Sequence, residues 1–259
     1  MPKDNQNLGC RECASSTGLG FDFTMAFQPI VNTTTRAIFA HEALVRGLYQ
    51  EPASQIFESI NDTNIYRFDQ SCRTKAIELA AKLKMQPFLS INFLPNAVYN
   101  PELCIRTTLA AAETYGFPVG QIIFEITEGE NIKDKAHLRA IVDYYKAKGF
   151  KTAIDDFGAG YAGLNLLAEI QTDLIKLDMA LIRHIDCDRN RKAIVKGIIQ
   201  VCHELSIMVI AEGVETYAEL ETLKSFGVEL FQGYYFAKPA FQALAVVPPE
   251  LLDNLMFHQ

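Results

Sequence analysis

Short apolar runs alternate with amphipathic stretches along most of this chain. The apolar runs have the length and composition of strands, whereas the stretches between them carry apolar residues at helical spacing. Strands that alternate with helices predict a parallel sheet with right-handed crossovers, and therefore an α/β fold. The predicted strands are residues 23–31, 37–45, 88–94, 122–127, 152–157, 174–178, 208–214 and 229–236, and the clearest predicted helices are 68–83, 103–115, 135–148, 191–205 and 217–226.

The number of strands favours a closed sheet. About eight strands in one domain of this length are typical of a (β/α)8 barrel. The linker between the first two strands, residues 32–36, is too short for a crossover helix, so these strands should form an antiparallel hairpin. An open doubly wound sheet is the alternative, but it would usually carry a glycine-rich phosphate loop after its first strand, which this sequence lacks. We predict a TIM-like (β/α)8 barrel with one antiparallel strand near the N-terminus.

The chain divides into a polar N-terminal segment, residues 1–20, and a single domain, residues 21–259. Cys10 and Cys13 form a lone CxxC pair in the first segment, which is half a zinc site at best. A flexible tail with two reduced thiols is the favoured interpretation, and a redox or metal sensor is the alternative.

Charge and hydropathy narrow the classes of partner. Lysine and arginine number 24 against 31 aspartates and glutamates, which gives a net charge of −7 and argues against a groove for long nucleic acid. The apolar runs are too short to span a membrane, and the polar first residues do not resemble a secretion signal. We therefore expect a cytoplasmic protein without membrane insertion.

Polar residues recur in or just after the apolar strands, mostly towards their carboxyl ends. In a barrel, these ends form the face that carries active sites. Burying several carboxylates together is costly unless cations compensate their charge. A single carboxylate of this kind could cap a helix or form an ion pair, but the recurrence indicates a site. The residues are Glu42, Asn92, Glu125, Asp155, Asp156, Lys176, Glu212 and Gln232.

The ligand types indicate which cations would bind. The candidate ligands are oxygen donors without histidine or cysteine, which suits Mg²⁺ or Mn²⁺ better than zinc. Asp155 and Asp156 are adjacent, so one could bridge two cations while the other holds only the second, as two-metal phosphoryl transfer requires. The glycine-rich residues after them, with Gly158 and Gly160, would let the backbone approach a ligand closely.

Seven sequence blocks resemble the EAL-domain cyclic di-GMP phosphodiesterases, in order from about residue 23 to about residue 241. The sequence is also similar to the EAL domains of blue-light-regulated phosphodiesterases, although it shows no photoreceptor domain. The resemblance implies a barrel with one antiparallel strand and hydrolysis of cyclic di-GMP to linear 5′-pGpG by a water that two metals activate. The blocks are HEALVRG (41–47), SINFLP (90–95), FEITEGE (124–130), IDDFGAGYAGLNLL (154–167), DLIKLDMALI (173–182), VIAEGVET (209–216) and LFQGYYFAKP (230–239).

The resemblance also implies residue roles. Asp155 would bridge the two metals, and Lys176 would orient the attacking water. Glu212 would be a metal ligand or a general base, and the two roles stay open. The first metal would be held by Glu42, Asn92, Glu125 and Asp155, and the second by Asp155, Asp156 and Glu212; the catalytic set would be Lys176, Glu212, Glu42 and Asp155; Gln28, Leu44, Arg46, Asp178 and Gln232 would contact the substrate. Glu128 would steady the Asp155–Gly163 loop, which contains Gly158 and Gly160, and Glu215 and Gln232 would support the metal shell.

Two other functions are open. Some EAL domains act as cyclic di-GMP receptors or bind proteins, but these usually lack a metal ligand, and this sequence lacks none. A barrel phosphodiesterase or lyase reached by convergence is the second alternative. In the loop, Ala159, Ala162 and Gly163 replace residues that carry hydroxyls in many members, which would affect rate and regulation. We also expect inhibition by Ca²⁺ and a homodimer with contacts at residues 186–192. Regulation would come from a partner protein, from the expression level or from the cysteine tail.

Overall fold

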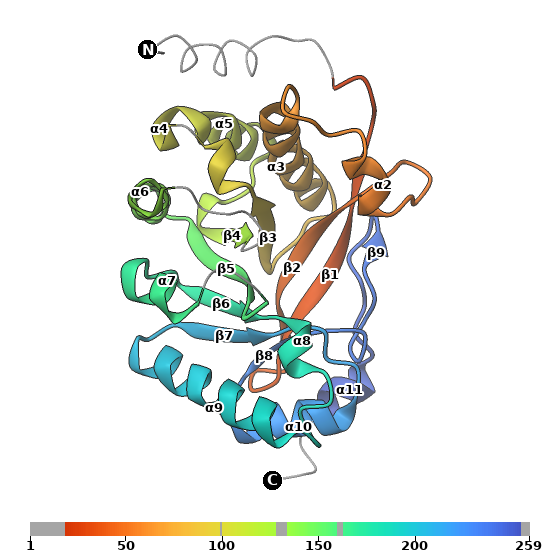
Figure 1. Cartoon of the computed structure of the whole chain (residues 1–259). Coiled ribbons are helices and arrows are strands. Elements are labelled where there is room, and N and C mark those ends of the chain that lie inside the picture. The colour runs from red at the N-terminus through yellow and green to blue at the C-terminus, as the bar shows by residue number, and fades with distance from the viewer. Residues whose placement is uncertain (1–18, 99, 128–133, 160–162, 255–259) are drawn as a thin grey trace.

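The predicted barrel is present in the computed structural model, which describes residues 19–98, 100–127, 134–159 and 163–254 (Figure 1). Eight strands follow one another around the barrel in chain order, and β8 pairs back onto β1. The Cys10–Cys13 pair lies outside the described residues, so the division into a tail and one domain stays a prediction. The strands are β1 (Thr24–Asn32), β2 (Ala37–Arg46), β3 (Phe88–Phe93), β4 (Ile122–Thr127), β5 (Lys151–Phe157), β6 (Leu174–Leu177), β7 (Met208–Ala211) and β8 (Leu230–Gln232).

The first strand runs against the rest of the barrel, as the short linker predicts. β1 is antiparallel to both of its neighbours, β2 and β8. The Asn32 side chain shapes the turn, since its Oδ1 accepts hydrogen bonds from the backbone N–H groups of Thr34 (2.9 Å) and Thr35 (2.8 Å). A short strand, β9 (Ala240–Phe241), adds to β1 from the C-terminal part of the chain.

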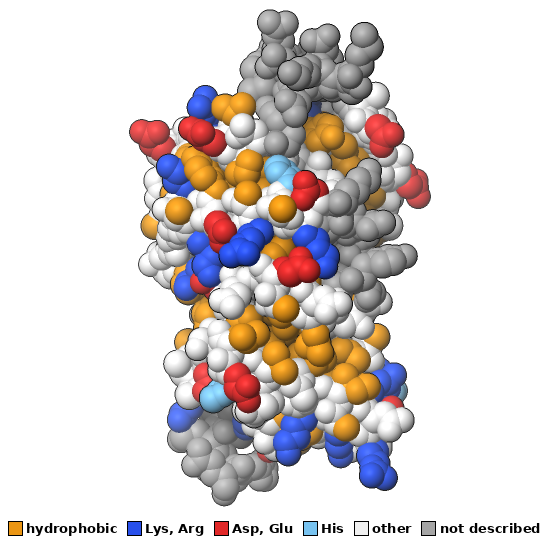
Figure 2. All heavy atoms as spheres, turned by 60° about the vertical axis from the view of Figure 1, so that its left-hand side comes forward, with side chains coloured by type: hydrophobic (Ala, Val, Ile, Leu, Met, Phe, Trp, Pro, Cys, Tyr) orange, Lys and Arg blue, Asp and Glu red, His pale blue; other side chains and the backbone are white. Residues whose placement is uncertain are grey.

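The predicted helices are present and surround the barrel (Figure 1). The predicted helix 103–115 is divided at Ile105, and the shorter helices were not predicted because a few residues cannot show helical periodicity. No helix within the described ranges is long and apolar enough to cross a membrane. The face of the molecule in Figure 2 carries acidic and basic side chains among apolar ones. The helices are α2 (Ala53–Phe57), α3 (Ile65–Lys82), α4 (Pro101–Cys104), α5 (Arg106–Tyr115), α6 (Lys135–Ala147), α7 (Leu164–Glu169), α8 (Met179–Ile182), α9 (Arg189–Glu204), α10 (Tyr217–Ser225) and α11 (Pro249–Asn254), with 3₁₀ turns η1 (Pro95–Ala97) and η2 (Val119–Gln121).

The last two predicted strands are too long. β7 ends at Ala211 and β8 at Gln232, because the chain leaves the sheet at both points to form the rim of the barrel. Gly213 has a φ of +66°, which glycine adopts without strain. Gly233 packs directly against the backbone of Val214, whose N–H donates a hydrogen bond to the Gln232 carbonyl at 3.1 Å. This close packing joins the two loops that follow β7 and β8.

Apolar side chains close the amino-terminal end of the barrel interior. They form a small cluster of their own, separate from the larger core between the strands and the helices. The barrel interior is therefore a packed core at this end, and a site inside the barrel would lie at the opposite end. The cluster consists of Ile30, Ala40, Ile123, Ala153, Leu174, Ile210 and Leu230.

Gly233→Ala should destabilise the fold. A Cβ at this position would lie 2.0 Å from the Val214 carbonyl oxygen, so the backbone must move. We expect the free energy of unfolding to fall by about 1–3 kcal/mol in urea denaturation followed by circular dichroism. Gly197→Ala is the matched control: Gly197 lies inside α9 with open space around the added Cβ, so alanine should raise stability by up to about 1 kcal/mol. Equal effects would contradict the packing argument.

Candidate metal centre

The candidate site residues share one layer of the barrel interior. Side chains two residues apart on a strand point to the same face of the sheet. Residues of the apolar cluster at the base of the barrel therefore have polar neighbours one layer further towards the mouth. Ile123 is followed by Glu125, Ala153 by Asp155, and Leu174 by Lys176. Because β1 runs in the opposite direction, its polar residue comes before its residue of the apolar cluster: Gln28 precedes Ile30. Because side chains alternate between the two faces of each strand, polar residues that are far apart in the sequence meet in one layer.

Lys176 lies at the centre of this layer. Its Nζ is 2.6 Å from Glu212 Oε1, 2.9 Å from both Glu125 Oε2 and Asp155 Oδ1, and 3.4 Å from Glu42 Oε2. The lysine is 1% exposed. Four carboxylates around one ammonium group leave a formal excess of three negative charges, which this lysine cannot compensate. Any cations bound here would share these oxygens with Lys176.

Burial and the neighbouring charges shift the pKa values of the residues in this cluster. Burial, and then the neighbouring carboxylates, raise the pKa of Glu125 and Glu212 well above the ordinary value. Burial opposes the charge on Lys176, but the surrounding carboxylates outweigh it and raise the pKa of the lysine. Burial alone would raise the pKa of Glu42, yet Lys176 and two side-chain amides lower it. Burial and mutual repulsion therefore oppose full ionisation of the carboxylates in this cluster.

Hydrogen bonds orient the carboxylates. Asn92 Nδ2 donates to Glu42 Oε1 (2.8 Å), and Gln232 Nε2 donates to Glu42 Oε2 (2.7 Å). Ser90 Oγ donates to Glu125 Oε1 at 2.5 Å. Ser90 was not predicted as a site residue, although it precedes Asn92 by two positions and so shares its face of β3. That spacing is the signal that could have identified it.

The donor set fits hard divalent cations. Among the described residues, no donor reaches the buried Asn92 Oδ1 or the buried Gln232 Oε1. A buried amide oxygen without a donor is a ligand that Mg²⁺ and Mn²⁺ accept. The Asn92 amide therefore presents its NH₂ group to Glu42, and its oxygen would be available to a cation.

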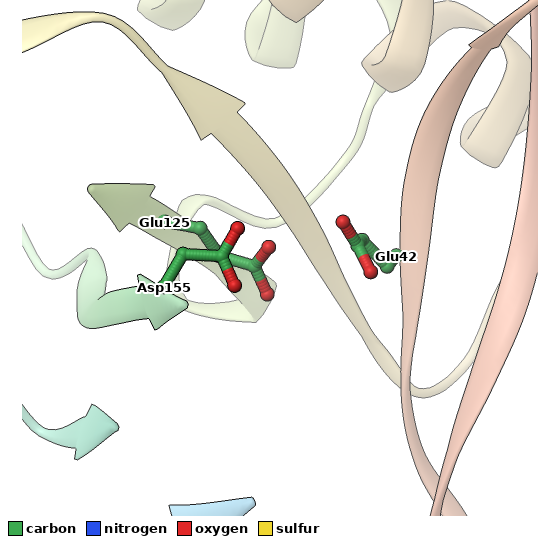
Figure 3. Close-up of side chains that lie close together, drawn as sticks. All are labelled: Glu42, Glu125 and Asp155. Atoms are coloured by element: carbon green, nitrogen blue, oxygen red, sulfur yellow. The ribbon is translucent and has the colours of Figure 1, made fainter. Parts of the chain in front are cut away.

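The carboxylates form two groups of three that share Asp155. Ligand oxygens of Glu42, Glu125 and Asp155 lie within 4.8 Å of one another, and so do those of Asp155, Asp156 and Glu212. Figure 3 shows the first group, with the three carboxylates approaching one another from β2, β4 and β5. This arrangement would place one cation in each group, with Asp155 between them.

A β-bulge places Asp156 in the second group. The pairing of β5 with β6 shifts register between Ile154 and Phe157, and Asp156 has a φ of +53°, which non-glycine residues rarely adopt. In a regular strand, Asp156 would point away from Asp155, to the outside of the barrel. The bulge instead turns the second carboxylate towards the mouth.

A cavity of about 240 Å³ lies over the second group. Of the predicted substrate-contacting residues, Gln28, Asp178 and Gln232 line it. Glu215 also lines the cavity and pairs with Arg183 at 2.7 Å. Its lining residues are Gln28, Glu42, Asp156, Asp178, Met179, Glu212, Gly213, Glu215, Gln232, Gly233 and Tyr234.

Other predicted residues do not line this cavity. Leu44 lies in a separate apolar cavity, and Arg46 donates a hydrogen bond from Nη1 to the Val45 carbonyl (2.7 Å). Gly158 has a φ of +100° and packs against Leu181. Glu128, Gly160 and Ala162 lie outside the described residues.

Comparisons with known proteins agree with this architecture. A family model described as the EAL domain matches residues 18–239. The chain belongs to the EAL family. It is 58% identical to a standalone EAL protein of Vibrio cholerae O395 solved with cyclic di-GMP bound, with a TM-score of 0.88 over 90% of this chain and 98% of that chain. It is 36% identical to BlrP1 of Klebsiella pneumoniae in a manganese/cyclic di-GMP complex, with a TM-score of 0.79 over 87% of this chain and 57% of that chain.

Curated relatives carry different names. The chain is 37% identical to the blue light- and temperature-regulated antirepressor BluF of Escherichia coli K12 over 91% of its own length and 58% of BluF. It is 29% identical to the probable cyclic di-GMP phosphodiesterase PdeG of the same organism, over 82% of this chain and 44% of PdeG. The chain thus spans about half the length of these relatives.

Asp156→Asn should stabilise the metal-free protein at pH 8. Desolvation, followed by the charges of Asp155 and Asp178, raises the pKa of Asp156 from 3.8 to about 6. Because the folded-state pKa lies above the ordinary value, the ionised group costs stability above pH 6, and this cost disappears as the pH falls towards 3.8. We expect a gain of roughly 1 kcal/mol at pH 8, reduced by solvent screening of this exposed side chain.

Urea unfolding of chelator-treated protein at pH 8 and pH 4 measures this effect. The difference between Asp156→Asn and the wild type should vanish at pH 4. The exposed Asp62→Asn is the control and should change stability little at either pH. An equal gain at both pH values would mean that the charge of Asp156 is not responsible.

Proposed function

We propose that this EAL domain hydrolyses cyclic di-GMP to linear 5′-pGpG with two divalent cations. The main support for this proposal is that two groups of three carboxylates share Asp155 and lie beside the cavity of about 240 Å³. Relatives named as cyclic di-GMP phosphodiesterases, and an EAL protein solved with cyclic di-GMP, support this substrate.

The two groups of three carboxylates suggest which residues would hold each cation. Glu42, Asn92, Glu125 and Asp155 would hold the first cation, and Asp155, Asp156 and Glu212 the second. Bound Mg²⁺ or Mn²⁺ would lower the pKa of the attacking water and stabilise negative charge on the phosphoryl oxygens. The metals also explain how an acidic mouth would accept an anionic substrate.

Lys176 and Glu212 would handle the proton and the orientation of the water. The pKa of Lys176 is raised, so the lysine stays protonated and acts as a hydrogen-bond donor rather than a base. The pKa of Glu212 is also raised, which suits a carboxylate that receives a proton near neutral pH. Since Glu212 also belongs to the second carboxylate group, its roles as ligand and as base both stay open.

Residues at the rim would position the substrate. Gln28 and Gln232 lie together, with Gln232 Nε2 3.4 Å from Gln28 Oε1, and both face the cavity with Asp178. Arg46 would contact a phosphate after releasing its bond to Val45. Leu44 would contact the substrate from the side of the separate apolar cavity. Glu128 would steady the Asp155–Gly163 loop, and Glu215 and Gln232 would support the metal shell.

A homodimer through residues 186–192 is also proposed. The segment is exposed in part and braced within the chain, since Lys192 Nζ donates to the Asp186 carbonyl (2.6 Å) and Asp188 caps α9. The first turns of α9 also expose Ile194, which is 52% accessible. A pre-ordered segment beside an exposed apolar residue suits a contact between copies.

A binding module is the second candidate. The 37% identity to BluF, which is named as an antirepressor, favours it, because that name describes an interaction with a regulator. The full set of candidate metal ligands favours the enzyme. The two functions differ in whether cyclic di-GMP is consumed.

Glu42→Ala should lower turnover of cyclic di-GMP by more than about 100-fold, because it removes a cation ligand and leaves Asn92 and Gln232 without their acceptor. Chromatographic detection of pGpG with Mg²⁺ or Mn²⁺ measures it, with the exposed Glu113→Ala as control. Wild-type protein that binds cyclic di-GMP but leaves it intact would overturn the enzyme proposal in favour of the receptor. Cleavage of cyclic di-AMP alone would change the proposed substrate.

Ca²⁺ in place of Mg²⁺ should lower turnover at least about tenfold while cyclic di-GMP still binds. Ca²⁺ takes more ligands at longer distances, so the attacking water would be poorly placed. BlrP1 has been solved in a calcium/cyclic di-GMP complex, with 34% identity and a TM-score of 0.80 over 90% of this chain and 59% of that chain. Rates measured at equal occupancy of the two cations test this point, and equal rates would contradict it.

A further inference from the structure

A buried ion pair lies outside the barrel wall, directly behind the candidate metal centre. Arg73 and Asp69 are one helical turn apart on α3, with Arg73 Nη2 2.5 Å from Asp69 Oδ2 and both side chains almost fully buried. Arg73 Nη1 also donates a hydrogen bond to the hydroxyl oxygen of Tyr145 on α6, at 3.1 Å. Buried pairs of this kind are costly to desolvate, and apolar replacements are often as stable. Stability alone does not account for this pair.

The guanidinium of Arg73 lies against two aromatic rings. The Cζ atom of Arg73 is 5.3 Å from the ring centres of both Phe93 and Phe124. The two rings are in an edge-to-face arrangement, with their centres 5.6 Å apart. Phe93 directly follows Asn92 on β3, and Phe124 directly precedes Glu125 on β4. Since successive side chains of a strand point to opposite faces, the rings face outwards where the two candidate ligands face inwards.

The carboxylate of Asp69 holds the backbone at the same place. Its second oxygen, Oδ1, accepts a hydrogen bond from the Leu94 N–H at 3.1 Å, just beyond the end of β3. Asn92 and Glu125 are paired in register on neighbouring strands. The ion pair therefore touches the chain immediately beside both ligands.

The end of β3 also borders a cavity, which Asp69 itself helps to line. An apolar cavity of about 460 Å³ lies between α2, α3 and β3, and Asn92, Phe93 and Leu94 are among its lining residues. A strand end beside a cavity loses the close contacts that normally fix backbone position. The contacts from Asp69 and Arg73 are the polar substitutes for that packing.

We propose that Asp69 and Arg73 are positioning residues for the metal centre, which act through Phe93, Leu94 and Phe124 to hold Asn92 and Glu125 in place. They touch neither the substrate nor the reacting atoms. The inference rests on the proposed function only in its assumption that these ligands bind a divalent cation. A positioning role predicts weaker metal binding in a protein that stays folded, whereas a structural role predicts lower stability with unchanged metal binding.

The double variant Asp69→Asn with Arg73→Met is the primary test. It removes both charges together, so no buried charge is left unpaired, and the asparagine oxygen can still accept from Leu94. Mn²⁺ binding to chelator-treated protein, measured by calorimetry without substrate, should weaken roughly tenfold or more. Circular dichroism and thermal unfolding of the metal-free protein report the fold independently.

The same helix offers a matched control. Glu78 and Lys82 form an ion pair with the same spacing at 2.5 Å, but the Lys82 side chain is 62% exposed, so this pair lies at the protein surface. Glu78→Gln with Lys82→Met should leave Mn²⁺ affinity unchanged. A folded Asp69/Arg73 double variant with wild-type Mn²⁺ affinity would overturn the proposal.

Arg73→Lys gives a second reading if the double variant does not fold. Lysine keeps a positive charge beside Asp69 but lacks the planar group that spans two rings and two acceptors. We expect Mn²⁺ affinity to fall several-fold, and wild-type affinity in this variant would contradict the positioning role.

Failure of this inference and failure of the proposed function give different results. Wild-type protein that binds Mn²⁺ but leaves cyclic di-GMP intact would overturn the function and leave the comparison of affinities valid. Wild-type protein that binds no Mn²⁺ would overturn both.

Discussion

The crowding of negative charge around Lys176 is the constraint on which the rest of the structure depends. Four carboxylates converge on one buried ammonium group, each from a different strand or strand end. Side-chain amides and a serine hydroxyl orient two of these carboxylates but do not neutralise them. The barrel must therefore hold together groups that repel one another, and its hydrogen-bonded strands fix the positions of these groups.

Much of the fold could be predicted from the sequence because it follows from periodicity. Strand and helix patterns predicted the barrel, and the five-residue linker predicted the antiparallel strand, since both depend on local spacing. The positions of Glu42, Glu125 and Asp155 at strand ends predicted the cluster, because parallel strands bring equivalent positions to one face. The resemblance to EAL domains then supplied roles that spacing could not.

Other features depend on tertiary contacts and could not be predicted in this way. The bulge at Asp156 arises from the pairing of β5 with β6, and nothing in the local sequence marks a positive φ for an aspartate. The early ends of β7 and β8 depend on Gly233 meeting the Val214 backbone, a contact between loops nearly 20 residues apart. The contacts of Arg73 join α3, α6 and two strands, so no single window of sequence contains them.

The reversed direction of β1 has a consequence for how this barrel can be joined to other modules. In a wholly parallel barrel, the polypeptide would arrive at the closed, apolar base. Here Thr24 pairs with Arg46, the last residue of β2, so the polypeptide arrives beside the open mouth. A sensory unit attached upstream would therefore sit next to the candidate metal centre, and its movement would reach Gln28 through only a few residues of a single strand.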